Sequence, residues 1–516
     1  PKLTLAATVT AASAGDIINI GPGTFSTESN IAANKNLTIQ GHGREETVFD
    51  GGSLGSTVGF MAITANVTIK NMTVQNYAKT AGASGQNYSQ TSGIIIGGTW
   101  GTASTNSSPL TVTIKNIKFY KNTSSISGSS THGGAVAVVD NINASNHTIN
   151  IEECLFYDNE ADGYGGAIYM GDGVTMTLEN CVLADNKASY GGAIMQTDWY
   201  ASSGAGALSV MNCTIYRNWA TTVSTWNVGG ICTYSSSNNE LMAVNVYNSI
   251  LMYNARGAND DDYYYEFLPL SSGTYVVYDI VKTATRLTYN PSMDNIDTFS
   301  TNNEYTVSAT WPGISGSDKT FHITSASSLL IGEAQGDATS IDANGVTRPQ
   351  GGGSDVGAYE YRNTWTGTSS TDWATAANWS LSTVPSTTSA YDAPIIADVT
   401  TDPVISTDVV IDNLEIENGG SLTIQKTGSL KLTEHLINNG SLTMQSDSDQ
   451  YSSLIVQGNS YGEVVHAANG TISSTYSGNI TYERHIADEG SNEWDFIGSP
   501  VEGQTMSAFV SANSNL

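Results

Sequence analysis

The sequence predicts an all-β chain in which a right-handed parallel β-helix is followed by a smaller C-terminal β domain. Three observations support this: a strand-favouring composition, a unit that recurs six times, and Gly-Gly pairs that recur between the units. Val, Ile, Thr and Tyr are plentiful, whereas charged residues make up 13%, about half the usual share of globular proteins. At 516 residues the chain is also long enough for at least two folding units.

The recurring unit is a run of about ten residues in which apolar side chains alternate and the alternation slips by one residue near the middle. An Asn marks each slip except in one copy, where Glu153 takes its place. A slip of one residue requires a corner between two short strands, and Asn tolerates the left-handed conformation of a tight corner. We expect these corner asparagines to stack in a hydrogen-bonded ladder. The copies are VTIKNMTVQN (67–76), VTIKNIKFYKN (112–122), INIEECLFYDN (149–159), MTLENCVLADN (176–186), LSVMNCTIYRN (208–218) and VNVYNSILMYN (244–254).

Gly-Gly opens a third strand after the second Asn of a copy, as in HGGAV (132–136), YGGAI (164–168), YGGAI (190–194) and VGGIC (228–232). Glycine at a corner permits positive φ and close backbone approach. Three short strands per repeat, stacked coil on coil, make a parallel β-helix, which we expect within residues 1–361, from about residue 15 onward.

The cysteines that follow the corners are expected to point inward as free thiols. Cys154, Cys181 and Cys213 share one position of the repeat. Adjacent in-register parallel strands suit disulfide geometry poorly, and no CxxC pair or nearby His cluster indicates zinc.

Acidic residues form two candidate metal sites. Asp140, Asp172 and Asp198 each lie seven residues after the first glycine of a Gly-Gly pair, and a second group, Asp260, Asp261 and Asp262, lies in NDDDYYYEF (259–267). Turn capping and a solvated loop are the favoured interpretations. Calcium is the main alternative for both groups, and a catalytic acid/base pair is the last alternative for the column.

Aromatic residues near the Gly-Gly corners are candidates for ligand binding. Tyr164 and Tyr190 precede Gly-Gly in neighbouring coils, and Trp199, Tyr200 and Trp226 lie in inserted loops. A row of aromatic faces suits sugar rings, although covering the solenoid surface is their simplest role.

The second half of the chain changes pattern after Arg362. Short Gly-Ser-Leu units at 420, 428 and 440 predict small solenoid rungs or hairpins in a module at 362–478, and residues 479–516 have the pattern of an incomplete start of a further β module.

Composition and motifs exclude several functions. A formal charge of −29 makes nucleic-acid binding improbable, and no apolar run is long enough to span a bilayer. There is no GxSxG, HExxH or P-loop motif, and the residues before the second Asn of each copy form no cationic base column of the kind a lyase needs, so we predict no catalytic residue.

The repeats resemble known surface proteins. The GGA[I/V] and FxxN signals, such as Gly165-Gly166-Ala167-Ile168 and Phe156xxAsn159, are similar to those of the polymorphic outer-membrane protein family. AASAGDIINIGPGTF (11–25) resembles the first coil of pectin-lyase-like β-helices, and residues 341–361 resemble the end motif of secreted bacterial β-helix proteins. WTGTSSTDWATAANWSLSTVP (365–385) and residues 480–503 resemble cargo of the type IX secretion system.

These resemblances imply a secreted protein on the outside of the outer membrane, exported by a type IX-like route that engages the secretion machinery. The expected function is a non-catalytic adhesin or stalk that binds an extracellular glycan or a host or cell-surface ligand. The alternative is a polysaccharide lyase or glycoside hydrolase acting on an extracellular polysaccharide, because the same β-helix carries enzymes and adhesins.

Overall fold

The computed structural model describes most of residues 4–257 and 340–456, together with a few short segments. Its described residues are 4–56, 58–80, 91–98, 108–125, 131–139, 147–198, 206–222, 228–235, 243–252, 254–257, 267–268, 280–281, 331–332, 334, 340–389, 391–434, 436–447, 449–456 and 479–482.

The chain divides into two compact units. Unit 1 comprises Pro1–Tyr361 with Glu463–Ser473, and unit 2 comprises Arg362–Gly462 with Ser474–Leu516. Each unit has its own cluster of buried apolar side chains. The predicted all-β architecture, a parallel β-helix followed by a smaller β domain, is confirmed.

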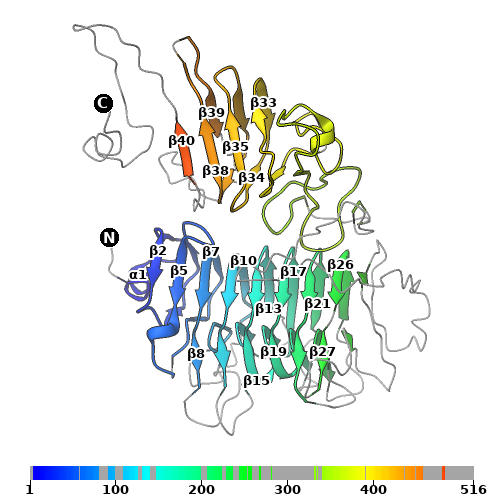
Figure 1. The fold of residues 1–516 in the computed structure, drawn as a ribbon. Coiled ribbons are helices and arrows are strands. Elements are labelled where there is room, and N and C mark those ends of the chain that lie inside the picture. Colours follow the sequence, from blue (N-terminus) through cyan, green and yellow to red (C-terminus); the bar gives the residue numbers. More distant parts are fainter. Residues whose placement is uncertain are drawn as a thin grey trace. The chain divides into compact units, whose positions relative to one another are not determined.

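The strands of unit 1 stack in parallel as successive coils (Figure 1). The largest sheet holds, within the described residues, β1 (Ile17–Asn19), β2 (Gly23–Phe25), β4 (Leu37–Gln40), β5 (Thr47–Asp50), β7 (Val67–Gln75), β10 (Thr111–Tyr120), β13 (His147–Glu152), β14 (Leu155–Tyr157), β17 (Val174–Glu179), β18 (Val182–Ala184), β21 (Ala207–Met211), β22 (Thr214–Tyr216), β25 (Ala243–Tyr247), β26 (Ser249–Met252) and β29 (Ile280–Val281). β29 pairs antiparallel with β26.

Two further sheets complete the coils. One holds the short strands β8 (Ala78–Lys79), β11 (Thr123–Ser124), β15 (Glu160–Tyr164), β19 (Lys187–Tyr190), β23 (Trp219–Ala220) and β27 (Ala255–Arg256). The other holds β3 (Ile31–Ala33), β6 (Met61–Ile63), β9 (Ile94–Ile96), β12 (Val136–Val138), β16 (Ile168–Met170), β20 (Ile194–Asp198), β24 (Ile231–Ser235) and β28 (Phe267–Leu268).

Equal positions of the repeat lie directly above one another. One inward column pairs the first apolar residue of each copy: Val67, Val112, Ile149, Met176, Leu208 and Val244. All six side chains are buried in the core cluster of unit 1. The sequence repeat is therefore a packing repeat, in which each coil buries its apolar face against its neighbours.

The predicted corners are confirmed by the backbone. Asn71, Asn116, Asn180, Asn212 and Asn248 all have φ between 44° and 60°, and Glu153 has φ 54° in the same conformation. Glu adopts left-handed backbone less readily than Asn does, so this conformation is less favourable at Glu153 than at the asparagine corners.

The continuous asparagine ladder lies at the second Asn of the last five copies, which corrects the expectation for the corner column. At the corners Asn116 Nδ2 donates to Asn71 Oδ1 at 3.0 Å, but Asn180 Nδ2 turns to the Ile341 carbonyl. At the second position the side-chain Nδ2 of each Asn donates to the Oδ1 of the Asn in the next coil, at 2.8–3.0 Å. The members of this column are Asn122, Asn159, Asn186, Asn218 and Asn254. The second column is fully buried, so its amides must satisfy one another.

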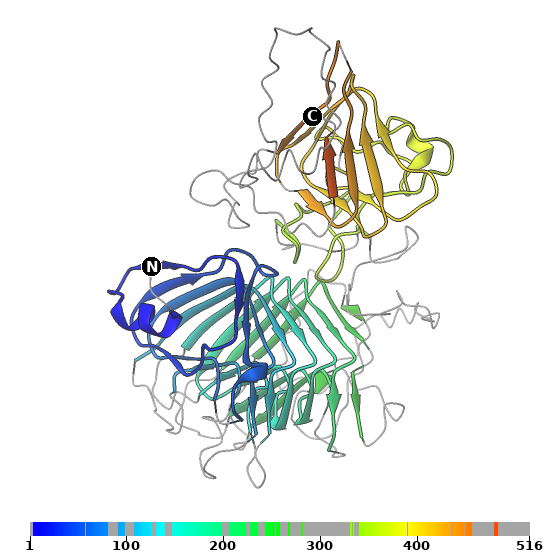
Figure 2. The same ribbon diagram turned by 60° about the vertical axis from the view of Figure 1, so that its left-hand side comes forward.

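The N-terminal end of the β-helix is covered by α1 (Leu5–Ala11), the blue helix in Figure 2. Leu5 and Val9 bury their side chains in the core cluster. The Glu28 carboxylate accepts the Leu5 N–H at 2.9 Å, and Lys35 Nζ donates to the Thr10 carbonyl at 2.7 Å, so both helix ends are capped. A 3₁₀ turn, η1 (Gly51–Ser53), follows β5.

Unit 2 is a second, smaller stack of parallel strands. Within the described residues its sheets are β30 (Thr364–Trp365), β31 (Ile395–Ile396), β34 (Leu414–Ile416) and β37 (Leu436–Asn438); β32 (Val404–Ile405), β35 (Ser421–Ile424), β38 (Ser441–Met444) and β40 (Asn479–Tyr482); and β33 (Asp408–Ile411), β36 (Ser429–Leu432) and β39 (Ser453–Val456).

The core of unit 2 joins its Gly-Ser-Leu units to three tryptophans. Leu422 pairs with Leu442, and Leu430 pairs with Leu454. Trp365, Trp373 and Trp379 are buried near η3 (Ala376–Asn378), and their rings meet edge to face. β40 pairs in parallel with β38, so residues 479–482 continue this stack, where the sequence suggested the start of a further module.

None of the helices in the described part of the chain is long and apolar enough to cross a membrane.

Candidate functional site

The outward side of the short strands carries a row of polar and aromatic side chains. We call the outward residues of β11, β15, β19 and β23 the short-strand face. Thr123, Glu160, Lys187 and Trp219 are in register, one per coil. Lys187 Nζ lies 2.9 Å from the Glu160 carboxylate and 5.3 Å from the centre of the Trp219 ring. The ammonium thus lies between a carboxylate and an aromatic ring, both of which favour its charge.

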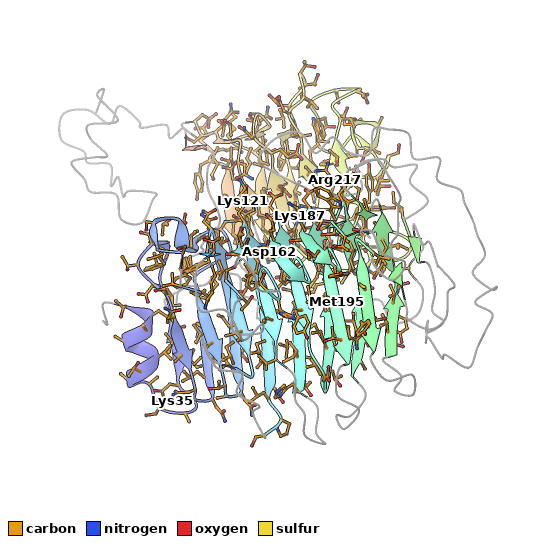
Figure 3. All side chains as sticks on the ribbon, turned by 90° about the horizontal axis from the view of Figure 1, so that it is seen from below. Lys35, Lys121, Asp162, Lys187, Met195 and Arg217 are labelled. Carbon is orange, nitrogen blue, oxygen red and sulfur yellow. The ribbon has the colours of Figure 1, made fainter. Side chains whose placement is uncertain are left out.

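A second outward row runs beside the first. Asp162 is exposed two residues after Glu160, because side chains two apart on a strand share a face. Ser125 Oγ donates to its carboxylate at 2.7 Å, and Ser189 Oγ donates to its backbone carbonyl. Figure 3 labels Asp162 and Lys187 together with Lys121 and Arg217, which precede the asparagine ladder in their own coils.

Aromatic side chains gather where the short strands meet Gly-Gly. We call His132, Tyr164, Tyr169, Tyr190 and Tyr234 the aromatic corner. The Tyr164 and Tyr190 rings stack at 5.2 Å between centres and 21° between planes. His132 packs against Tyr164 on the next coil, and Tyr234 is close enough to influence the pKa of Tyr164.

A register shift keeps the tyrosines aligned. β15 and β19 pair through Ala161 and Ala188, and then again through Tyr164 and Tyr190, so β15 carries one extra residue between these pairs. The extra residue is accommodated as a bulge. The two coils therefore differ in length but present the same side chain at the same corner.

The stacking limits what the tyrosines can offer a ligand. Because Tyr164 and Tyr190 face each other, and His132 covers the other side of Tyr164, a sugar ring meets ring edges and hydroxyl groups rather than open faces. Burial, and then the neighbouring Tyr190, raise the pKa of Tyr164. Its hydroxyl therefore stays protonated at neutral pH and can donate a hydrogen bond.

A separate cluster of charges lies at the first corner of the coils. We call Lys115, Glu152, Glu153 and Glu179 the first-corner cluster. Lys115, Glu152 and Glu179 are in register on β10, β13 and β17. Lys115 Nζ lies 3.4 Å from Glu152 and 3.2 Å from Glu153.

Two carboxylates of this cluster, those of Glu153 and Glu179, are shifted toward the protonated form. Burial raises the pKa of Glu153 despite Lys115, and burial followed by Glu152 raises that of Glu179. Burial alone would lower the pKa of Lys115. The negative charges of Glu153 and Glu152 have the larger combined effect, so the pKa of Lys115 is raised. Lys115 therefore stays protonated and is not available as a base, whereas Glu153 and Glu179 keep a proton to higher pH than ordinary glutamates do.

The first-corner cluster was not predicted, although the sequence carries a signal for it. The residue before each corner is in turn Lys70, Lys115, Glu152, Glu179, Met211 and Tyr247. The residue before the second Asn, at which a cationic base column was expected for a lyase, carries Lys121, Asp158, Asp185 and Arg217, and all four have positive φ.

The residues proposed for ligand binding are only partly brought together. Tyr164 and Tyr190 are in contact, while Trp199, Tyr200 and Trp226 lie outside the described residues.

The proposed metal ligands are mostly beyond the described residues as well. Asp140, Asp260, Asp261 and Asp262 are outside them, and the structure describes only the backbone of Asp198, which pairs with Ser235. Asp172 is 2% exposed in the turn after β16. Among the residues that are described, no three His, Cys, Asp or Glu side chains are grouped as metal ligands would be, and calcium remains a hypothesis.

The thiol column is confirmed. Cys154, Cys181, Cys213 and Cys232 are buried thiols that form no disulfide. The Cys181 N–H points to the Cys213 sulfur at 3.3 Å, and the Cys213 N–H points to the hydroxyl of Ser249 in the next coil. Burial raises the pKa of Cys154 and Cys181, so these thiols are unreactive in the folded chain.

Comparison with known proteins found two family models. Residues 364–516 match a domain of unknown function (DUF8693), and residues 153–171 match the Chlamydia polymorphic membrane protein repeat. The second match covers one corner, β14, β15 and the Gly-Gly turn, which are the elements of the predicted repeat. No curated protein matches the chain.

Two solved structures share a distant likeness. They are a PL6 family alginate lyase, AlyGC, and a mutant of it, each 11% identical to this chain. The match covers 93% of this chain, 79% of the mutant and 87% of the other structure, with TM-scores of 0.18 and 0.20 respectively. At these values the likeness carries no argument about the site.

Proposed function

We propose that this chain is a secreted, cell-surface β-helix protein that binds an extracellular glycan without cleaving it. The short-strand face and the aromatic corner form the binding surface. The match to the Chlamydia polymorphic membrane protein repeat supports a surface location, and the resemblance of residues 365–385 and 480–503 to type IX cargo supports the export route.

One observation carries the proposal: Lys187 is held between Glu160 and Trp219 beside the exposed Asp162. These groups supply hydrogen-bond donors, acceptors and an aromatic surface within neighbouring coils, which is the mixture that sugar hydroxyls and C–H faces require. The protein already holds the charges in place, so less ordering is needed when a ligand binds.

The charge balance of this face favours a neutral glycan. The outward charges Glu160, Asp162 and Lys187 sum to −1, and the adjoining Lys121, Asp158, Asp185 and Arg217 sum to zero. A polyanionic chain would find no net positive charge to replace its counterions.

A polysaccharide panel scored both for binding and for new chain ends tests this proposal. We expect retention of neutral glycans with no release of reducing or unsaturated ends. Trp219→Ala should weaken retention, whereas Lys118→Ala, a control that removes a surface ion pair with Glu45, should not.

Glycan cleavage is the second candidate, and the first-corner cluster is the observation that favours it. Glu153 and Glu179 have raised pKa values beside Lys115, which suits a general acid. If the panel shows chain cleavage that Glu179→Gln abolishes, the enzyme class replaces the binding proposal.

A further inference from the structure

The segment before unit 2 lies across the flank of the β-helix. We call residues 340–361 the strap. The Asn180 amide donates to the Ile341 carbonyl at 2.8 Å, and the Gly357 N–H donates to the Asn248 carbonyl at 2.8 Å. Arg44 donates to the Asn344 side chain at 3.2 Å, so the strap spans the coils from Arg44 to Asn248.

The strap covers an otherwise exposed row of outward side chains. The Ala358 N–H donates to Thr214 Oγ1 at 3.2 Å. Gly357 has φ +105°, and a Cβ there would lie 2.6 Å from Ile250 Cδ1. Thr214 and Ile250 are 1% and 2% exposed. The close fit shows that the strap is packed against the coils and does not merely pass over them.

A buried arginine holds the strap together. Arg348 pairs with Glu360 at 2.5 Å, and both side chains are 0% exposed. The same guanidinium donates to the backbone carbonyls of Ile341, Asp355 and Gly357. Removing it would leave buried carbonyls and a buried carboxylate unpaired.

The strap buries three carboxylates and this one guanidinium. Asp342 accepts the backbone N–H groups of Asn344, Val346 and Glu360. Asp355 accepts those of Gly332 and Tyr361, and Glu360 accepts those of Gln350 and Asp355. Asp342, Asp355 and Glu360 are all at most 1% exposed.

The buried charges of the strap do not balance. Three carboxylates against Arg348 would leave two negative charges in a site without solvent, which is costly unless a proton is retained. Burial, and then Glu360, raise the pKa of Asp355 to about 7, and burial also raises the pKa of Glu360. The charge of Glu360 raises the pKa of Asp355, so we treat the two carboxyl groups as a pair that holds one proton into the neutral range.

We propose that the strap is a latch: it stays docked on the β-helix while the Asp355–Glu360 pair holds a proton, and it loosens when that proton is lost. The latch faces the same flank as the first-corner cluster, because Arg44 contacts both the Glu153 carbonyl and Asn344.

The direction of the effect follows from the raised pKa. A carboxylic acid whose pKa is raised on docking contributes stability that is complete below about pH 4 and is lost as the pH rises toward 7. The other groups near the strap are Arg44, Tyr157, Glu153, Glu179 and Tyr359. Burial raises the pKa of Tyr157 and that of Tyr359, the latter to about 12. Burial also raises the pKa of Glu153 and of Glu179, which are the neighbouring carboxyl groups to control for.

Hydrogen exchange of the full chain, followed by mass spectrometry from pH 5 to pH 9 and corrected for intrinsic rates, tests the latch. Peptides covering residues 340–361 should lose protection by at least about tenfold between pH 5 and pH 7 and should change little above about pH 7. Peptides from β12 and β16, which belong to another sheet, should not change and serve as the internal reference.

Two variants separate the proposed pair from its neighbours. Asp355→Asn should remove the pH response, and Glu179→Gln should keep it. Constant strap protection across the wild-type series, or a loss that begins only above pH 7, overturns the latch. A pH-dependent loss of strap protection that persists in Asp355→Asn also overturns the latch. If Asp355→Asn leaves the strap undocked at every pH, the wild-type series decides.

Discussion

The buried asparagine ladder is the most demanding residue-level feature of the β-helix. Asn186 accepts the backbone N–H and the side-chain amide of Asn159, and it donates to the Phe156 carbonyl and to Asn218. We expect Asn186→Ala to lower the free energy of unfolding by about 3 kcal/mol, because it leaves buried backbone groups unpaired. Urea denaturation measures this. Asn34→Ala, at an exposed position, should change it by less than about 0.5 kcal/mol, and equal losses in the two variants would refute the role of the ladder.

A buried histidine predicts acid sensitivity. His147 is 1% exposed, its Nδ1 accepts the Leu110 N–H, and its Nε2 has no partner among the described residues. Burial lowers its pKa to about 4. The unfolded chain therefore binds a proton more readily between about pH 6.5 and pH 4, and unit 1 should lose up to about 3 kcal/mol as the pH falls through this range.

The measurement for His147 is a pair of stability curves against pH. His147→Asn keeps an acceptor for Leu110 but does not titrate, so the variant should lose less stability than the wild type between pH 7 and pH 4. Parallel curves for the two proteins would contradict the assignment.

For single residues, the sequence predicts backbone conformation better than it predicts side-chain contacts. The corner positions and their left-handed backbone could be predicted because a phase slip at Asn requires a tight turn between two strands. The sequence could not show which of the two asparagine columns would form the hydrogen-bonded ladder, because that depends on side-chain burial. The cluster of Lys115, Glu152 and Glu179 could not be predicted, because each residue has the sequence context of an ordinary solvated charge. Only the strand register places the three in line.

Among the elements, the Gly-Gly turn leaves no room for a side chain. A Cβ on Gly166 would lie 2.2 Å from the Gly192 carbonyl oxygen and 2.5 Å from the Lys187 nitrogen, both backbone atoms of the next coil. We expect Gly166→Ala to destabilise unit 1 by at least about 3 kcal/mol or to prevent its folding.

Gly21→Ala is the matched control, because a Cβ there meets no atom within 4 Å. Thermal unfolding followed by circular dichroism compares the two variants. A Gly166→Ala protein as stable as the Gly21→Ala protein would show that the coils can separate at this turn without cost.

The strands could be predicted as a repeating set, but their exact alignment could not. Each short alternating run carries its own burial pattern, so the stack follows from the repeat. The extra residue of β15 is different: a bulge at this point and an insertion in the following loop give the same spacing in sequence. The strap likewise appears in the sequence as an end motif, and its docking depends on contacts between residues far apart in the chain.

At the scale of the whole molecule, two separate cores predict two unfolding events. The apolar cluster of unit 1 and that of unit 2 have no member in common. Calorimetry should therefore resolve two transitions. Leu430→Ala, in the core of unit 2, should shift one of them by the equivalent of about 2–5 kcal/mol and leave the other in place. A single transition that moves as a whole would contradict this.

Composition indicated the large-scale properties of the chain but not its ligand. Few charges and many strand-forming residues predict an all-β chain, and the formal charge of −29 argues against polyanion binding. Function depends instead on a few outward side chains, and the repeat constrains these least because they face solvent.

Calorimetric titration of a neutral oligosaccharide retained by the wild-type protein tests the central claim, that the short-strand face binds glycan. The double variant Asp162→Ala/Trp219→Ala should bind at least about tenfold more weakly, a loss of about 1.4 kcal/mol, while Lys118→Ala on another face should bind as the wild type does. Unchanged affinity in the double variant, or equal losses in both proteins, would contradict the account.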